Sequence, residues 1–168
     1  MPDGRGVDAQ QDFFRWHVTS VNVPGRLSSL GRMNTLASWA EQLARALLQE
    51  PLPRRWAHVQ GVATRARSLV PVLGTDAGLL EAAGWLHDIG YAPGLAVTGL
   101  HALDGARYLR DAQHADAMLC RLVAHHSCAI IEAGERRLAD VLGFEFEPAP
   151  YVLSSVLTLC DPGEALGL

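Results

Sequence analysis

Hydrophobic residues follow a helical period through most of the chain, beginning near residue 35. From Thr35, apolar side chains recur every three or four positions until Pro51, which predicts a first amphipathic helix. A second predicted helix starts at Pro53, because proline is favourable in the first turn of a helix, and it continues to about residue 70. Residues 1–32 show no lasting period and contain several glycines, so we expect a loose N-terminal leader there.

The third predicted helix carries an adjacent histidine and aspartate near its end. It starts at Asp76 or at the threonine before it, since both residue types cap helix N-termini, and it runs to Ile89. Gly90 is expected to end this helix in the left-handed conformation that glycine adopts readily. This interpretation places His87 and Asp88 in the last turn of the helix.

Further helical segments fill the rest of the chain, and no alternating pattern typical of a β-strand competes with them. They cover residues 100–111, 115–126, 130–142 and 150–160. The pattern predicts an all-α fold, a single-domain bundle of about six to seven helices over residues 33–168. The sequence leaves open whether translation starts at Met1 or at Met33, where the helical pattern begins.

Composition narrows the classes of protein to consider. The chain has 168 residues, of which 49% are hydrophobic, enough to fill the core of one domain. Its formal net charge of −4 creates no field that attracts nucleic acid, which favours a small substrate. Three cysteines without close-paired spacing indicate neither a disulfide framework nor a cysteine zinc site. With no secretory signal and no apolar run that could span a membrane, we expect a cytoplasmic protein that binds neither nucleic acid nor membrane.

Histidines and aspartates gather at the ends and faces of the predicted helices. Imidazole and carboxylate groups are ligands for divalent transition metals, and a set without thiolates favours a catalytic site over a closed structural one. Taken singly, each residue has a structural explanation such as packing or helix capping, but their joint occurrence points to a metal site. The candidate ligands are His58, His87, Asp88, His101, His125, His126 and Asp161.

The adjacent pair His87 and Asp88 needs a geometric explanation, because neighbours on a helix point about 100° apart. Near a helix end, a metal between the two side-chain directions can accept a nitrogen from one residue and an oxygen from the other. The second oxygen of Asp88 can then bridge to another ion. Two ions roughly 3.5–4 Å apart would activate a water and stabilise charge on a phosphoryl group. We therefore expect His87 and Asp88 to be the catalytic residues.

This pattern resembles the HD superfamily, whose motif is a histidine, a distant His-Asp pair and a later aspartate around a metal centre. The matching segments are RRWAHVQGVATRA, AAGWLHDIGY and VLTLCD, and the similarity covers about residues 35–162. The resemblance implies an HD-type helical bundle with metal-dependent phosphohydrolase activity. It also implies a first metal site in which Asp88 is the bridging ligand, formed by His58, His87, Asp88 and Asp161.

Two further segments, HALDGARYLR and VAHHS, resemble the extra histidine segments of binuclear HD members. That resemblance assigns His101, and one or both of His125 and His126, to a second metal. The implied cofactor is one or two divalent ions, and the sequence does not distinguish among Mn, Fe, Mg, Zn, Ni and Co.

Two features depart from the family pattern. Many HD hydrolases have a lysine after the HDIG motif, whereas this chain has Tyr91, so the substrate phosphate needs another cation. Arg65 and Arg107 are the candidates, with Tyr91 as a hydrogen-bond donor. The chain also continues only briefly after Asp161, which leads to the hypothesis that a partner subunit of a homodimer, or the N-terminal leader, completes the pocket.

The sequence thus predicts an enzyme that cleaves a phosphate ester or a nucleotide-type substrate through metal-activated water. Two alternatives remain open within the HD superfamily: a di-iron protein that performs oxygen-dependent chemistry, and a metal-binding regulatory module without turnover. Dispersed arginines balanced by acids are interpreted as solvated surface rather than as a nucleic-acid interface. These arginines are Arg54, Arg55, Arg136 and Arg137.

Overall fold

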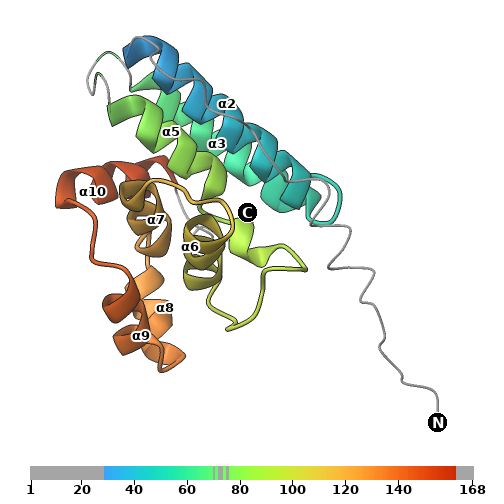
Figure 1. Ribbon diagram of the computed structural model, residues 1–168, viewed down its shortest axis with the longest axis vertical. Helices are drawn as coiled ribbons and strands as arrows, with labels where there is room; N and C mark the ends of the chain where they lie inside the picture. Colours follow the sequence, from blue (N-terminus) through green and yellow to red (C-terminus); the bar gives the residue numbers. More distant parts are fainter. Residues whose placement is uncertain (1–28, 70, 72–73, 75, 162–168) are drawn as a thin grey trace.

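The computed structural model describes residues 29–69, 71, 74 and 76–161, with only the backbone described for 29–34. These residues form eight α-helices and one 3-10 helix, and no strand occurs among them (Figure 1). The predicted all-α fold is therefore confirmed, with one helix more than the predicted range within the described part of the chain. The leader up to residue 28 and the segment after Asp161 lie outside the described residues.

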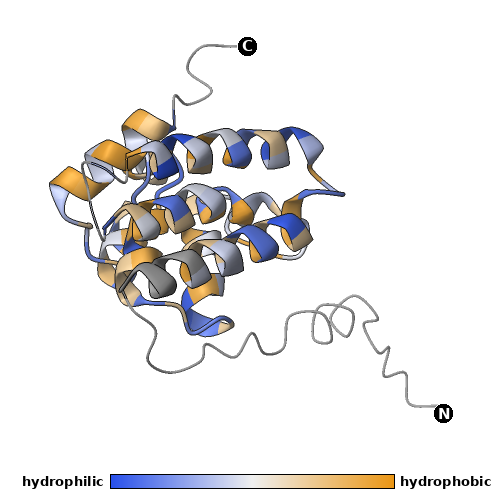
Figure 2. Cartoon of the chain, turned by 90° about the horizontal axis from the view of Figure 1, so that it is seen from above, coloured by the Kyte–Doolittle hydropathy of each residue, from blue (hydrophilic) through white to orange (hydrophobic). Residues whose placement is uncertain are grey.

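Three helices near the N-terminus pack side by side: α2 (Ser29–Leu48), α3 (Pro53–Ser68) and α5 (Asp76–Leu86). Hydrophobic and hydrophilic residues alternate around the helices (Figure 2), and the apolar faces form much of the buried core. A side chain at Gly84 would lie 3.0 Å from the Cα atom of Ala63, so glycine lets α3 and α5 approach closely. Helix α2 begins at Ser29 rather than at the predicted Thr35. Its first turn therefore lies within the segment that we expected to be a loose leader.

The second half of the chain consists of shorter helices that build the other side of the site. Helix α6 packs against α7, while α10 returns to contact α3, α5 and α7. Figure 1 shows α8 and α9 at the end of the molecule far from α2. The bounds are α6 (His101–Asp111), α7 (Ala117–Ala124), α8 (Ala129–Glu135), α9 (Ala139–Glu145) and α10 (Tyr151–Cys160).

The single helix predicted over residues 130–142 is wrong, because the chain forms α8 and α9 with a bend between them. Arg137 adopts a left-handed conformation with φ of 59°. The N–H of Leu138 donates to the carbonyl of Ala133 at 2.7 Å, as in a Schellman-type helix end. The bend brings Leu138 and the buried Leu142 against the core, so tertiary packing overrides the continuous helical pattern.

The predicted end of the third helix is also wrong. Helix α5 stops at Leu86 and is followed by a 3-10 helix, η1 (Ile89–Tyr91). Gly90 does not take the left-handed conformation expected of it. Gly90 instead lets two backbone segments approach each other closely, because a Cβ atom there would lie only 1.9 Å from the carbonyl oxygen of His101. Gly90 therefore allows η1 to pack directly on the first turn of α6.

A buried aspartate holds the loop that connects η1 to α6. The carboxylate of Asp104 accepts hydrogen bonds from the backbone N–H of Val97 at 3.0 Å and from that of Thr98 at 3.0 and 3.1 Å. These bonds satisfy loop donors that lack a helical partner. Asp104 thereby fixes the start of α6, where His101 lies.

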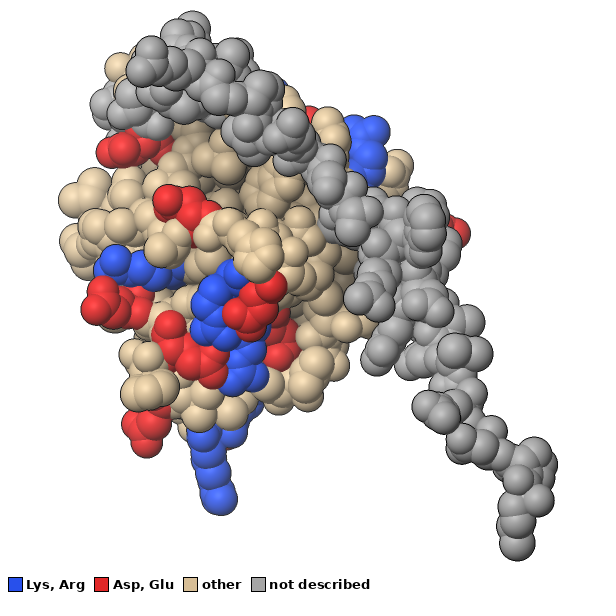
Figure 3. Space-filling model, in the orientation of Figure 1, with Lys and Arg blue, Asp and Glu red and all other residues tan. Residues whose placement is uncertain are grey.

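The molecular surface shown in Figure 3 carries acidic and basic side chains next to one another among uncharged residues. Elsewhere in the described part, Glu145 forms ion pairs with both Arg107 and Arg110. None of the described helices is both long and apolar enough to cross a membrane.

Candidate metal centre

Five separate segments bring histidines and aspartates to one place. Helix α3 supplies His58, the turn after α5 supplies His87 and Asp88, and the first residue of α6 is His101. His126 follows the end of α7, and Asp161 follows the last residue of α10. The six side chains surround or adjoin a half-open pocket of about 260 Å³.

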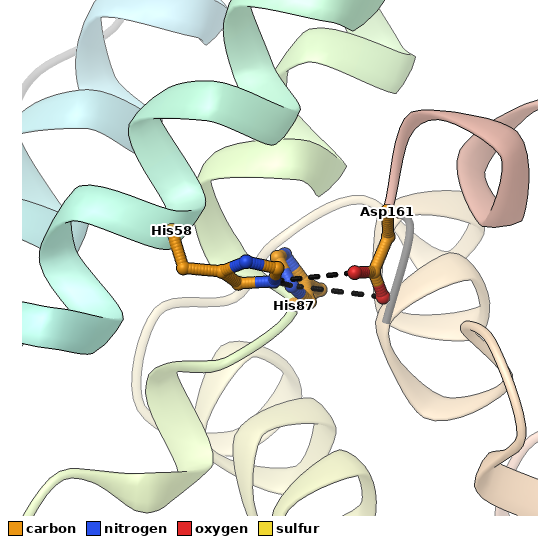
Figure 4. Close-up of side chains that lie close together, drawn as sticks. All are labelled: His58, His87 and Asp161. Atoms are coloured by element: carbon orange, nitrogen blue, oxygen red, sulfur yellow. Dashed lines mark hydrogen bonds and ion pairs between the residues drawn. The ribbon is translucent and has the colours of Figure 1, made fainter. Parts of the chain in front are cut away.

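The first ligand set consists of His58, His87 and Asp161 (Figure 4). The Nε2 atom of His58 lies 3.2 Å from Nε2 of His87 and 3.2 Å from Oδ1 of Asp161. The Oδ2 atom of Asp161 lies 4.0 Å from Nε2 of His87. Figure 4 shows the two rings and the carboxylate directed toward one another from different helices.

The second ligand set consists of Asp88, His101 and His126. The Nε2 atoms of His101 and His126 are 3.1 Å apart, and Oδ1 of Asp88 lies 3.6 Å from Nε2 of His101. The same Oδ1 atom lies 3.6 Å from Nε2 of His87, and Oδ2 lies 3.9 Å from Nε2 of His58. Asp88 thus faces both sets, which is the position expected of a bridging carboxylate.

Two of the imidazole rings are oriented by hydrogen bonds on their other nitrogen, and a third lies near a carboxylate. The Nδ1 atom of His87 lies 2.9 Å from the carbonyl oxygen of Gly84, and Nδ1 of His126 lies 2.6 Å from that of Val123. The Nδ1 atom of His101 faces Oε2 of Glu132 at 3.5 Å. Since carbonyls only accept hydrogen bonds, the partners of His87 and His126 place the ring proton of each on Nδ1. They leave Nε2 as the atom with a lone pair directed into the centre.

This donor set fits a divalent cation. In the neutral rings, the Nε2 lone pairs converge with two carboxylates, so electron-pair donors face one another at 3–4 Å. Asp88 and Asp161 are 3% and 7% exposed, and buried carboxylates need compensating positive charge. Imidazole and carboxylate ligands suit several first-row metals. The residues present therefore have the chemistry of a metal centre.

Burial and neighbouring charges shift the pKa values of four of these ligands. Burial lowers the pKa of His101 to about 4 and that of His126 to about 4, so both rings are neutral near pH 7. Burial by itself raises the pKa of the Asp88 carboxyl. The electrostatic interactions with the surrounding histidines and Arg55 together have a larger effect, so the pKa of Asp88 is lower than its usual value. His58 differs, because its hydrogen bond to Asp161 raises its pKa, so a metal ion that binds there must displace the proton between these two side chains.

Ser127 orients the last ligand. Its hydroxyl donates a hydrogen bond to Oδ2 of Asp161, and its backbone adopts a left-handed conformation with φ of 46°. This conformation is uncommon for residues other than glycine, asparagine and aspartate. The strained turn after α7 thus delivers His126 and the Ser127 hydroxyl to the same centre.

The structure does not bring every predicted site residue to the centre. His125 lies outside both ligand sets, because its ring nitrogen Nε2 contacts the carbonyl oxygen of Phe146 at 2.7 Å. Arg65 donates to the carbonyl of Cys160 at 3.0 Å, while Arg107 pairs with Glu145. Neither arginine lines the pocket, so their predicted contact with substrate phosphate is not supported by their positions.

Arg55 is one site residue that the sequence analysis missed, since we interpreted it as solvated surface. It lines the pocket, and its Nη1 atom lies 3.2 Å from Oδ2 of Asp88. Tyr91 also lines the pocket, as predicted, and Glu132 is a further residue that went unnoticed. A signal for Arg55 existed in its spacing, because it precedes His58 by three residues, and such residues share a helix face.

Comparison with known proteins identifies the family of this chain. Residues 55–161, well over half of the chain, match the family model described as HD domain. The chain belongs to the HD domain family. Members of this family are typically metal-dependent phosphohydrolases, and the two histidine–aspartate sets lie within or at the end of the matched region.

A relative among curated proteins is Ribonuclease Y of Thermoanaerobacter pseudethanolicus. It is 29% identical over 104 residues, which are 62% of this chain and 18% of the relative. The chain therefore matches less than a fifth of the length of that protein. No solved structure gives a significant match.

Proposed function

We propose that this HD domain is a metal-dependent phosphohydrolase that cleaves a small phosphate ester or a nucleotide-type substrate. The observation that carries the proposal is the pair of adjacent ligand sets, with Asp88 facing both. Hydrolysis of phosphate esters is a common use of paired metal sites. The family match supports the same class of chemistry.

We assign His58, His87 and Asp161 to one divalent ion and His101 and His126 to the other, with Asp88 as the shared ligand. The ion is one of Mn, Fe, Mg, Zn, Ni or Co. When bound, such ions lower the pKa of a coordinated water and neutralise charge on a phosphoryl group.

The protein residues hold the groups that this chemistry needs. The carbonyls of Gly84 and Val123 fix the rings of His87 and His126. The Ser127 hydroxyl fixes Asp161. Low pKa values of His101 and His126 leave one nitrogen of each ring unprotonated near neutral pH. The ligands are therefore oriented before a cation or a substrate binds, which reduces the cost of organising the site.

The pocket and the surface support a small substrate. A volume of about 260 Å³ accommodates a phosphate group and part of its ester substituent. The mixed charges on the face shown in Figure 3 resemble ordinary solvated surface rather than a basic track for nucleic acid. Because the Thermoanaerobacter relative is named a ribonuclease, a short oligoribonucleotide still belongs among the substrates to test.

The proposal is tested by purifying the protein without chelators, measuring bound metal by elemental analysis, and assaying phosphate release. The panel contains phosphomonoesters, phosphodiesters, nucleotides and the oligoribonucleotide, each with added Mn²⁺. We expect about two ions per chain and turnover, both reduced in Asp88→Asn. The matched control is Asp140→Asn, an exposed aspartate on α9, which should behave as wild type. Metal binding without release from any substrate would overturn the phosphohydrolase proposal and favour a sensor or an oxygen-dependent protein.

A further inference from the structure

The pocket contains a cation whose position depends on an aromatic neighbour. Among the described residues that line it, Arg55 has the only permanently charged basic side chain, beside the carboxylates of Asp88, Glu132 and Asp161. The side chain of Arg55 is 24% exposed, so it lies at the boundary between the centre and solvent. A substrate that enters the pocket passes this guanidinium.

Tyr91 contacts both Arg55 and a metal-site histidine. The Cζ atom of Arg55 lies 4.1 Å from the centroid of the Tyr91 ring. The centroids of Tyr91 and His101 are also 4.1 Å apart, and the two rings are within 14° of parallel. A guanidinium is attracted to the face of an aromatic ring and stacks on it. The phenol ring therefore links the orientation of Arg55 to the ligand set.

The position of Tyr91 is set by the backbone rather than by a flexible side chain. Tyr91 is the last residue of η1, and its N–H donates to the carbonyl of Asp88 at 3.1 Å. Gly90 allows η1 to lie against the backbone of His101, where any Cβ atom would collide. The ring thus has a fixed place beside His101, which makes it a suitable support for the guanidinium of Arg55, in addition to the ion pair with Asp88.

We infer that Tyr91 is a positioning residue that holds the Arg55 guanidinium at the metal centre, where Arg55 binds the phosphate of the substrate. This inference rests on the proposed phosphohydrolase function. A guanidinium has a planar array of N–H donors that matches two phosphate oxygens, and its charge is permanent. The motif position that carries lysine in many HD hydrolases thus supplies support for a cation, while the cation itself comes from α3.

The first test measures binding of inorganic phosphate to the metal-loaded protein by calorimetry, which requires no turnover. Arg55→Gln should raise the dissociation constant about tenfold or more, as expected for loss of a charge-assisted hydrogen bond. Arg54→Gln, a change at the exposed neighbour on α3, should leave it unchanged. Tyr91→Leu should weaken phosphate binding as Arg55→Gln does, whereas Tyr91→Phe, which retains the ring, should weaken it less than Tyr91→Leu.

A double-mutant cycle distinguishes positioning from a general structural role. If Tyr91 acts through Arg55, adding Tyr91→Leu to Arg55→Gln should cause little further loss. Metal content, measured on each variant, should stay at the wild-type level. Additive losses, or unchanged phosphate binding in Tyr91→Leu at full metal content, would overturn the inference. So would loss of metal in Tyr91→Leu that accounts for its weaker phosphate binding.

Turnover separates this inference from the proposed function. With the best substrate of the panel, Arg55→Gln and Tyr91→Leu should raise KM more than they lower kcat, while Tyr91→Phe should raise KM less than Tyr91→Leu. If wild type binds phosphate in an Arg55-dependent manner but hydrolyses nothing, the phosphohydrolase proposal fails and the role of Arg55 and Tyr91 in phosphate binding stands. If the wild-type protein hydrolyses a substrate and Arg55→Gln and Tyr91→Leu have the same KM as wild type, the inference fails and the proposed function stands.

Discussion

Two adjacent histidines at the end of α7 have different surroundings, although the sequence gives them equivalent positions. His126 is 4% exposed and directs Nε2 toward His101 at 3.1 Å. The preceding His125 turns toward the carbonyl of Phe146 instead. The helix ends at Ala124, and the change of backbone direction there separates the two rings. Only the residue after the turn reaches the centre.

This difference leads to a prediction about the second ion. His126→Asn should reduce bound metal from about two ions per chain toward one, because it removes a ligand of the second set. His125→Asn is the matched control, and it should retain the metal while losing about 1 kcal/mol of stability with its hydrogen bond. Elemental analysis and denaturant unfolding measure the two effects. Equal metal loss in both variants would contradict the assignment of His126.

Ser127 shows how one residue can serve the site through an unfavourable backbone conformation. Its φ of 46° and its hydrogen bond to Asp161 occur together. A regular helical continuation of α7 would leave the hydroxyl and His126 on diverging faces, since successive helical side chains point about 100° apart. The site thus depends on where α7 stops.

At the scale of elements, the packing of η1 against α6 decides the geometry of the centre. Gly90 and Gly105 lie in contact, with a Cβ atom at Gly105 only 3.2 Å from the backbone nitrogen of Gly90. This contact brings Asp88, which precedes η1, close to His101, which begins α6. The distance between these two ligands therefore reflects the absence of side chains at two glycines.

Gly90→Ala should consequently destabilise the protein and weaken metal binding. Its Cβ would meet the His101 carbonyl at 1.9 Å, and such overpacking typically costs about 1–3 kcal/mol. Gly143→Ala is the control, because nothing lies within 4 Å of its added Cβ on α9. That change should be neutral or should stabilise by about 0.5–1 kcal/mol. Thermal unfolding with and without Mn²⁺ tests both variants, and a wild-type response of Gly90→Ala would exclude this role for the contact.

At the scale of the whole molecule, the ligands tie together segments that are distant in the sequence. His58 on α3 and Asp161 after α10 meet across more than a hundred residues, with their nearest atoms 3.2 Å apart. The α2, α3 and α5 group is thus joined at this centre to α6, α7 and α10. A cation bound there stabilises the folded state, because the unfolded chain has no equivalent site.

Metal removal should therefore lower the thermal midpoint. Free metal at about 100 times its dissociation constant contributes about 2.7 kcal/mol, which corresponds to a shift of roughly 5–10 °C for a chain of this size. We expect a chelator to lower Tm by this amount and Mn²⁺ to restore it. Asp88→Asn should show little response to either addition. A wild-type midpoint that is insensitive to both would argue against a metal centre that links these segments.

The sequence by itself determined the helical class, the HD motif and most of the candidate ligands. Helical periodicity is a local property, so it located α3, α6 and α10 within a few residues. The residue types at His58, His87, Asp88 and Asp161 indicated metal binding, because imidazole and carboxylate groups are ligands for divalent transition metals.

Only the tertiary structure decided how these residues meet. It placed His126 rather than His125 in the centre, brought Arg55 in from what we had interpreted as solvated surface, and divided residues 130–142 into two helices. It also changed the explanation of Gly90 from helix capping to close approach. The physical reason is common to all four cases: they depend on contacts between segments far apart in the chain, which local propensity and spacing do not encode.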